Sequence, residues 1–209
     1  MQEAMKQEIE ALYRNHTWSL VPPSNTQQVV GTKCIFKIKR NSDGIIYKHK
    51  ARLVVKGYKQ QPGIDFHETY SPVIKSSTVR IILTLATSYN WPLKQLDVNN
   101  AFLHGNLSEK VFIPQPTGFT DPFAPHHVCY LHKVLYGLQQ APRAWFDKFR
   151  NTFLHWGFRN SATDYSLFIH KHGNSVTYLL IFVEDIIVIG NSSTFINSFI
   201  SSLYKQFAH

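Results

Sequence analysis

The chain has 209 residues and a formal net charge of +9, with 44% hydrophobic and 17% charged residues. This composition is typical of a folded globular protein and excludes a disordered one. Two cysteines are too few for a disulfide framework, and the longest apolar stretch, residues 178–189, is too short for a membrane span. We therefore expect an intracellular protein without a membrane partner, cytoplasmic by default, whose entry into the nucleus would depend on partners.

The first half of the chain is predicted to form two helices, a long hairpin and a strand. In chain order these are a helix over 3–14, strands over 29–39 and 45–56, a helix from Ser77 or Thr78 through Ala86, and a strand over 93–98. Residues 41–44, Asn-Ser-Asp-Gly, are a strong hairpin signal between the two strands. The apolar stripe of the first helix is expected to include Tyr13.

The second half is predicted to contain a loop, two helices and three strands. These are a loop over 114–127, a helix from Pro142 to a stop at Gly157, strands over 167–170, 176–183 and 186–189, and a last helix with Phe195, Phe199, Leu203 and Phe207 on one face. Helices and strands alternate without βαβ regularity, which favours the α+β class.

Positive charge is concentrated in the predicted hairpin. Residues 31–60 include nine basic residues and one acidic residue, which is +8 and leaves about +1 for the rest of the chain. Because side chains alternate along a strand, Phe36 faces one side and Lys37 and Lys39 face the other. A cationic ribbon of this kind suggests a surface for phosphates, although a solvated face could also hold many of these lysines.

Three acidic residues lie beside apolar strand residues: Asp97, Glu184 and Asp185. Carboxylates are rarely buried unless they are paired or bound to a metal. A tight turn would bring Glu184 and Asp185 near one spot, and if Asp97 reached it, three negative charges would require cations. Mg²⁺ prefers such oxygen ligands and keeps positions open for substrate phosphates. The alternative is that Glu184 and Asp185 form only an exposed hairpin turn.

Five stretches of the sequence resemble the reverse-transcriptase domain of Ty1/copia retrotransposons. They are Lys50–Tyr58, Glu68–Val73, Leu96–Gly105, Leu135–Trp145 and Phe182–Asp185. Each is long, and they occur in the family's order and approximate spacing. The resemblance covers the whole chain, from the first predicted helix to the C-terminus.

The resemblance implies a polymerase right-hand fold of fingers and palm, with an antiparallel palm sheet packed on helices. Roughly, residues 1–90 would form the N-terminal region and fingers, including the basic hairpin 29–57. Residues 91–209 would form mainly the palm, with the fingers/palm motif at 135–145. Because the family continues into a thumb and an RNase H, we expect residues 1–209 to be a single truncated domain with the thumb missing.

By the same resemblance, Asp97, Glu184 and Asp185 would be the catalytic and metal-binding residues. Asp97 resembles the aspartate of polymerase motif A, and Glu184 and Asp185 stand at motif C. Together they would hold two Mg²⁺ ions, with Mn²⁺ as a substitute, to activate a primer 3′-hydroxyl and stabilise the leaving pyrophosphate. The implied substrates are dNTPs, and the implied partners are an RNA template and a DNA primer; no oligomeric state is predicted.

The resemblance also assigns nucleotide-binding roles to seven residues: Lys50, Arg52, Lys56, Phe102, Tyr136, Gly137 and Pro142. Phe102 resembles an aromatic gate that clashes with a ribose 2′-hydroxyl, and the alternative is an ordinary core phenylalanine. Tyr136, Gly137 and Pro142 are similar to the motif that shapes the nucleotide pocket. The three basic residues resemble fingers residues that meet the triphosphate, and which of them would touch template phosphates instead stays open.

Three positions depart from the family pattern. Glu184 stands where motif C has aspartate, so its side chain is longer by about 1.5 Å, and we expect a large loss of polymerase rate. Gln139 replaces a lysine, and Cys34 replaces a tryptophan in the first hairpin strand. The competing hypotheses are therefore a weakened RNA-directed DNA polymerase, a non-catalytic nucleic-acid-binding remnant and an unstable pseudogene product without function.

A cluster of His126, His127, Cys129 and His132 has spacings compatible with zinc. No second ligand cluster lies at finger-like spacing, and the family has a Val-Cys-x-Leu segment here. We favour the interpretation of Cys129 as a small core residue on a strand.

Overall fold

The computed structural model describes residues 2–98, 101–182 and 185–207. These residues form four α-helices and antiparallel sheets, which agrees with the predicted α+β class. The chain divides into two units, each made of two segments: Met1–Thr69 with Phe102–Trp145, and Tyr70–Ala101 with Phe146–His209. Among the described residues, no helix is both long and apolar enough to cross a membrane.

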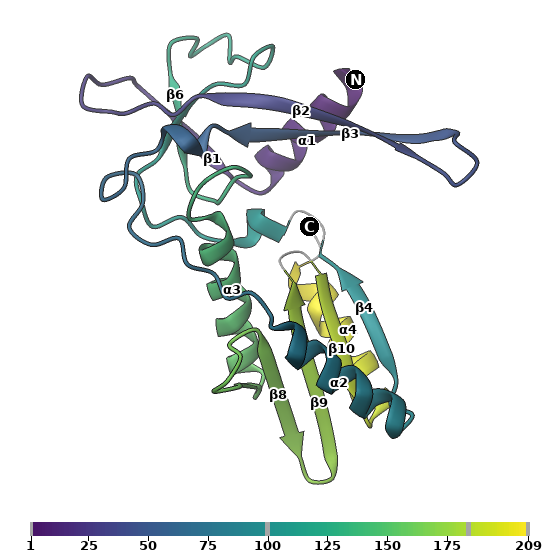
Figure 1. Cartoon of the computed structure of the whole chain (residues 1–209). Coiled ribbons are helices and arrows are strands. Elements are labelled where there is room, and N and C mark those ends of the chain that lie inside the picture. Colours follow the sequence, from purple (N-terminus) through teal and green to yellow (C-terminus); the bar gives the residue numbers. More distant parts are fainter. Residues whose placement is uncertain (1, 99–100, 183–184, 208–209) are drawn as a thin grey trace. The chain divides into compact units, whose positions relative to one another are not determined.

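The first unit contains one helix, a long hairpin and a small sheet (Figure 1). Its elements are α1 (Gln2–Arg14), β1 (Trp18–Val21), β2 (Thr32–Arg40), β3 (Ile46–Val55), β5 (Phe112–Pro114) and β6 (Val128–Leu131), with a 3-10 turn at Gly57–Lys59. Strands β2 and β3 pair with each other, and the small sheet has the order β1-β6-β5. The segment 115–127 between β5 and β6 is a loop; the predicted loop began one residue earlier, at the last residue of β5.

Helix α1 buries one apolar stripe in the core of the first unit. Met5, Ile9 and Leu12 are buried there with Leu53 and Val55 of β3. The apolar face of α1 therefore covers the C-terminal half of β3. Tyr13 was predicted on this stripe but is 46% exposed. Its ring lies outside the buried stripe and packs edge-on against Trp18, with 5.4 Å between centroids.

The basic hairpin has the predicted alternation. Lys37 lies opposite Lys50 and Lys39 opposite Lys48, so these four side chains share one face of the β2–β3 ribbon. The turn between the strands contains Gly44 with a φ of 83°, a conformation that glycine adopts without strain. The part of the ribbon near this turn is exposed on both faces.

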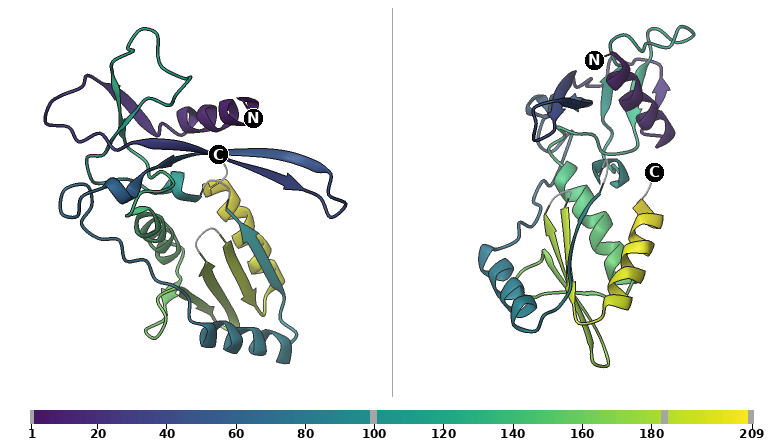
Figure 2. Two further views of the ribbon diagram at one scale, coloured as in Figure 1. Left: turned by 45° about the horizontal axis from the view of Figure 1, so that its top comes forward. Right: turned by 90° about the vertical axis from the view of Figure 1, so that its right-hand side faces the viewer.

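The second unit is built on a five-stranded sheet with the order β4-β10-β9-β8-β7. Its elements are α2 (Ser76–Ser88), β4 (Leu93–Asp97), the end of α3 (Ala141–His155), β7 (Arg159–Asn160), β8 (Leu167–His172), β9 (Ser175–Phe182), β10 (Asp185–Gly190) and α4 (Ser193–Phe207); a 3-10 turn, Ala101–His104, begins at its border. In the right-hand view of Figure 2, α2 lies on one side of the sheet and α3 and α4 lie on the other.

Aromatic side chains form the core between the sheet and helices α3 and α4. Phe153 lies at the centre, with its ring 5.5 Å from Phe168 of β8, 5.2 Å from Phe149 and 5.9 Å from Phe199 of α4. The helical spacing of these phenylalanines was predicted, and so was the stop at Gly157, which has a φ of 86°. This packing fixes the orientation of β8 within the sheet.

Helix α2 covers the opposite face of the sheet with Ile82 and Ala86. Its predicted cap was wrong: the N-cap is Lys75, and no side chain caps the first turn. The Thr78 hydroxyl instead forms a hydrogen bond with Asp164, whose carboxylate also accepts hydrogen bonds from the Lys75 and Ser166 amides. Burial raises the pKa of Asp164, but these hydrogen bonds outweigh it and hold the pKa below its usual value.

Candidate active site

Asp97 and Asp185 lie directly opposite each other in the second unit. Asp97 ends β4, Asp185 begins β10, and the two residues are register partners in the antiparallel pair. Opposite residues in such a pair have Cβ atoms about 4.5–5.5 Å apart and project from the same face of the sheet. Asp97 is exposed and Asp185 is half-buried. The sheet therefore brings together two of the three predicted catalytic carboxylates.

The surroundings of this pair are suited to a cation. Like charges directly opposite on two strands repel each other, and Asp185 accepts a hydrogen bond from a neutral amide: Gln95 Nε2 donates to Asp185 Oδ1 at 3.2 Å. Two hard oxygen ligands at an exposed sheet end fit Mg²⁺, which is often bound by one or two carboxylates plus substrate phosphates. Glu184, the third predicted ligand, lies outside the described residues. Within the described residues, no group of three or more His, Cys, Asp or Glu side chains is arranged around one point.

In the first unit, three of the seven predicted nucleotide-binding residues form a cluster. The Arg52 guanidinium lies over the Tyr136 ring, 4.1 Å from its centroid. The Phe102 ring packs edge-on against the same tyrosine at 5.0 Å. We call Arg52, Tyr136 and Phe102 the guanidinium–aromatic cluster. Tyr136 is 8% exposed, whereas Arg52 and Phe102 are half-buried, so the cluster presents a cation and an aromatic edge at the surface of the unit.

The backbone at Gly137 holds Tyr136 against β3. The Tyr136 carbonyl accepts a hydrogen bond from the Val55 amide at 2.8 Å. Gly137 has a φ of 89°, and a Cβ at this position would meet the Val55 carbonyl oxygen and come within 2.7 Å of Val54 Cγ1. A Cβ on Gly57 would in turn meet the Gly137 carbonyl oxygen. Both glycines are therefore required by close backbone approach, which fixes the 135–138 loop on the end of the hairpin.

The other predicted nucleotide-binding residues lie at different places in the first unit. Lys50 lies on the cationic face of the ribbon, on the same side as Arg52. The Lys56 side chain runs past Gly31, where its Cδ lies 3.4 Å from the position of a Cβ. Pro142 stands in the first turn of α3, a position that suits its fixed φ and missing N–H.

A buried network of polar side chains supports the 135–140 segment and was not predicted. Gln60 Nε2 donates to Gln140 Oε1 at 3.1 Å, and the Gln139 amide donates to Gln60 Oε1 at 2.9 Å. Gln140 Nε2 donates to the Asp65 carbonyl at 3.0 Å. Gln60, Asp65 and Gln140 are all buried, so the network ties the turn after β3 to the segment that carries Tyr136 and Gly137.

Replacing Gln140 by leucine is expected to destabilise the first unit by about 2–6 kcal/mol. The change keeps most of the volume but leaves Gln60 Nε2 and the Asp65 carbonyl buried without their partners, at about 1–3 kcal/mol each. Urea unfolding measures the loss. Gln139→Leu is the matched control, since the exposed Gln139 takes part in the network only through its backbone amide, and we expect a change within about 0.5 kcal/mol. Equal effects of the two changes would contradict this role.

A second unpredicted contact links α1 to the hairpin. Glu8 Oε1 accepts a hydrogen bond from the Leu53 amide at 3.2 Å. Burial raises the pKa of Glu8, and the Leu53 amide and the nearby charges of Arg52 and Lys50 oppose that rise. Glu8 therefore places a counter-charge near two of the predicted phosphate-binding cations. An isolated glutamate on an amphipathic helix gives no sequence signal for this position.

The candidate zinc cluster does not assemble. Cys129 is fully buried in β6, and burial raises the pKa of its thiol to about 12, which disfavours the thiolate that zinc requires. His132 contacts other groups: its Nε2 lies 3.0 Å from Ser19 Oγ, and its ring packs edge-on against Tyr130. The interpretation of Cys129 as a small core residue on a strand is confirmed.

Comparison with known proteins agrees with this arrangement. The family model described as reverse transcriptase (RNA-dependent DNA polymerase) matches residues 15–209. The chain is 50% identical over 206 residues to the retrovirus-related Pol polyprotein from transposon RE1 of Arabidopsis thaliana, covering 98% of the chain and 14% of that protein. It is 38% identical over 208 residues to the corresponding polyprotein from transposon TNT 1-94 of Nicotiana tabacum, covering 99% of the chain and 16% of that protein.

A more distant relative is the transposon Ty1-ER2 Gag-Pol polyprotein of Saccharomyces cerevisiae, 28% identical over 217 residues, which cover 98% of the chain and 11% of that protein. The family model and these relatives show a reverse-transcriptase domain. The chain belongs to the reverse transcriptase (RNA-dependent DNA polymerase) family, and its relatives are Pol polyproteins of copia-type transposons. It spans about one seventh of the length of the RE1 polyprotein.

Proposed function

We propose that this chain is an RNA-directed DNA polymerase domain that transfers nucleotides from dNTPs to a primer 3′-hydroxyl. The observation that carries the proposal is the register pairing of Asp97 with Asp185, which sets two carboxylates opposite each other at an exposed sheet end. In this proposal the five-stranded sheet is the palm, and the β2–β3 ribbon is part of the fingers.

Asp97, Asp185 and Glu184 would hold two Mg²⁺ ions. When bound, the metal ions would lower the pKa of the primer hydroxyl and neutralise charge on the leaving pyrophosphate. The residues of the chain position the ligands: the β4–β10 pairing fixes the two aspartates, and Gln95 orients the Asp185 carboxylate through its 3.2 Å hydrogen bond. Gln95→Ala would therefore loosen metal binding without removing a ligand.

The guanidinium–aromatic cluster would receive the incoming nucleotide. Arg52 offers a planar cation for a triphosphate, and its stacking on Tyr136 limits the rotamers that it must lose on binding. Phe102 packs on the same ring and would act as the gate against a ribose 2′-hydroxyl. Gly137 and Pro142 would shape the loop that carries Tyr136. Lys50 and Lys56 supply further positive charge on the hairpin and its end.

The cationic face of the ribbon would bind the template. Lys37, Lys39, Lys48 and Lys50 lie together on this face, and lysine ammonium groups bind phosphates as point charges. This face also favours the second candidate function, a non-catalytic nucleic-acid-binding remnant, because phosphate binding by the ribbon does not depend on the carboxylates.

Primer extension separates the two functions. The chain is incubated with an RNA template, a labelled DNA primer and dNTPs, in Mg²⁺ and in Mn²⁺, beside Asp97→Asn. We expect slow extension by the unmodified chain and none by Asp97→Asn, while both bind the template–primer equally. Extension that survives Asp97→Asn would overturn the polymerase assignment. Salt-dependent binding with no incorporation under any condition would support the remnant.

A further inference from the structure

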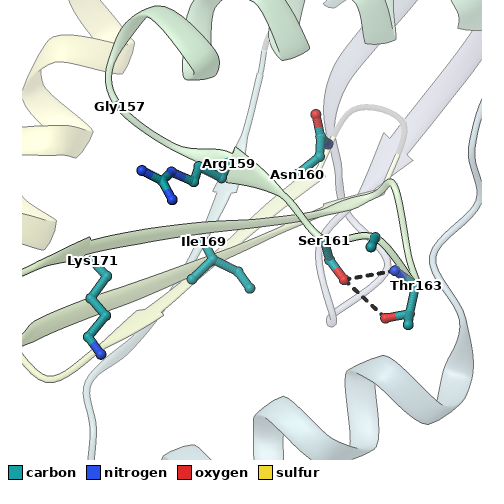
Figure 3. Close-up of a pocket in the computed structure, with 8 residues that line it drawn as sticks. Gly157, Arg159, Asn160, Ser161, Thr163, Ile169 and Lys171 are labelled. Atoms are coloured by element: carbon teal, nitrogen blue, oxygen red, sulfur yellow. Dashed lines mark hydrogen bonds between the residues drawn. The ribbon is translucent and has the colours of Figure 1, made fainter.

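A pocket of about 690 Å³ opens in the second unit beside the edge strand β7 (Figure 3), and neither Asp97 nor Asp185 lines it. Its volume lies in the range of ligand-binding pockets. The side chains that matter for its chemistry are Arg159, Ser161, Thr163, Ile169 and Lys171. No acidic residue is among those that line it, so the pocket favours an anion.

The strand pairing fixes the two cations relative to each other. Arg159 of β7 is the register partner of Ile169 of β8, and Lys171 follows Ile169 by two residues. Arg159 and Lys171 are therefore diagonal neighbours on one face of the sheet, with Cα atoms about 7–8 Å apart. Figure 3 shows the apolar Ile169 side chain beside both of them. Within the part of the chain that the structure describes, neither cation has an ion pair with an acidic side chain.

The rim of the pocket keeps a hydrogen-bond donor for a ligand. Ser161 Oγ and Thr163 Oγ1 lie 3.1 Å apart, and Ser161 Oγ also accepts a hydrogen bond from the Thr163 amide. The two hydroxyls share one hydrogen bond, so one of their two hydrogens remains available. The turn itself is held in place from outside the pocket, since Lys75 Nζ donates to the Thr163 carbonyl at 2.7 Å.

The nearest carboxylate does not cancel the positive charge of the two cations. Asp164 is 4% exposed, and its oxygens accept hydrogen bonds from the Lys75 and Ser166 amides, so the carboxylate is turned into the structure. The adjacent charge of Lys75 offsets it. The net charge at the mouth of the pocket is that of Arg159 and Lys171.

We infer that this pocket binds the sugar–phosphate backbone of one nucleic-acid strand, at a second contact point separate from the carboxylate pair. The Cα atoms of the two cationic residues lie about 7–8 Å apart, and phosphates of one strand rise about 3.4 Å per nucleotide along a duplex axis, so the two long side chains can reach phosphates of the same strand. Ile169 offers an apolar floor for a sugar, and the remaining hydroxyl hydrogen offers a donor for a phosphate oxygen. The inference rests on the proposed function in so far as the ligand is a template or primer strand.

The pocket and the carboxylate pair lie on the same face of the sheet, the face on which α2 packs. Asp185 pairs with Phe182, Ile169 pairs with Tyr178 four residues along β9, and β8 and β10 are separated by one strand. With usual strand spacings, Ile169 lies about 16 Å from Asp185. Arg159, Ile169 and Lys171 project from the same face of the sheet as Asp97 and Asp185, because the register pairs connect them strand by strand.

The test is the salt dependence of binding to a fluorescein-labelled single-stranded RNA of twelve nucleotides. Each phosphate contact contributes about −0.7 to the slope of log K against log salt for a single strand. We expect the double variant Arg159→Gln/Lys171→Gln to lower the magnitude of the slope by about 1.4 and to weaken binding about 10- to 30-fold at 0.1 M salt. The matched control is Arg150→Gln/Lys205→Gln, which removes the same charges from α3 and α4 across the sheet.

Three results would overturn the inference. One is an unchanged slope in the pocket variant while the unmodified chain binds RNA, which leaves the polymerase proposal intact. Another is an equal change of slope in the control, which would show that only the overall charge matters. The last is no RNA binding by the unmodified chain, which would also remove the nucleic-acid partner from the proposed function. Thermal unfolding of each variant checks that the fold is kept.

Discussion

Replacing Glu184 by aspartate is expected to raise the rate of single-nucleotide incorporation in Mg²⁺ by roughly 100-fold. Glutamate carries one methylene more than the aspartate of the family motif, so its carboxylate reaches about 1.5 Å further. A misplacement of about 1 Å in a catalytic group can cost about 100-fold in rate, and Mg²⁺ demands near-ideal octahedral geometry. The opposite pairing of Asp97 and Asp185 means that two of the three ligands are already fixed by the sheet.

The measurement is single-turnover incorporation of one dNTP on an RNA-templated primer at saturating template–primer. Asp97→Asn in the Glu184→Asp background is the control and should abolish the gain. We expect a smaller gain in Mn²⁺, which tolerates less regular geometry. Equal rates for Glu184→Asp and the unmodified chain would contradict the idea that the extra methylene limits this copy.

Acidic residues beside apolar strands are chemically unusual, which singled out Asp97, Glu184 and Asp185, but only the family resemblance assigned them to one site. Asp185 precedes the β-branched run at residues 186–189, and Asp97 follows the buried Leu96; a charge beside such residues is costly without a partner. The β4–β10 register then shows how they meet. The basic hairpin was predicted from alternation and from the Asn-Ser-Asp-Gly turn, because both are local signals.

The small sheet, the buried glutamine network and the pocket could not be predicted, because each depends on contacts between residues far apart in the sequence or on a very short strand. The β1-β6-β5 sheet pairs Trp18 with Leu131, and strands this short give no periodic pattern of their own. The Gln60–Gln140 hydrogen bond joins residues 80 positions apart. Because glutamine is usually exposed, neither side chain was predicted to be buried. The β7 edge strand has two residues, and its pocket exists only because Arg159 pairs with Ile169.

Replacing Gly137 by alanine is expected to destabilise the first unit by about 2–5 kcal/mol and to displace Tyr136. The positive φ of 89° costs a residue with a Cβ about 1–2 kcal/mol. The added methyl would also meet the Val55 carbonyl oxygen and Val54 Cγ1, and overpacking of this kind costs about 1–3 kcal/mol. Because the Val55 carbonyl belongs to the backbone of β3, the loop must move instead.

Gly118→Ala is the matched control for this prediction. Gly118 has a φ of 83°, almost the same as Gly137, but nothing lies within 4 Å of the position of its Cβ. Its substitution therefore carries only the cost of the backbone conformation, about 1–2 kcal/mol. Urea unfolding measures both variants, and equal losses of stability would show that the close approach to β3 contributes nothing.

The functional consequence follows from the contact between Tyr136 and Arg52. If the 135–138 loop moves away from β3, the Arg52 guanidinium loses the ring that lies 4.1 Å below it. We then expect Gly137→Ala to raise the apparent KM for dNTP about 10-fold or more in the Glu184→Asp background, where incorporation is fast enough to measure. Gly118→Ala should leave that KM unchanged. A Gly137→Ala chain that is destabilised but keeps the unmodified KM would mean that the Arg52–Tyr136 stack supports the fold without contacting the nucleotide.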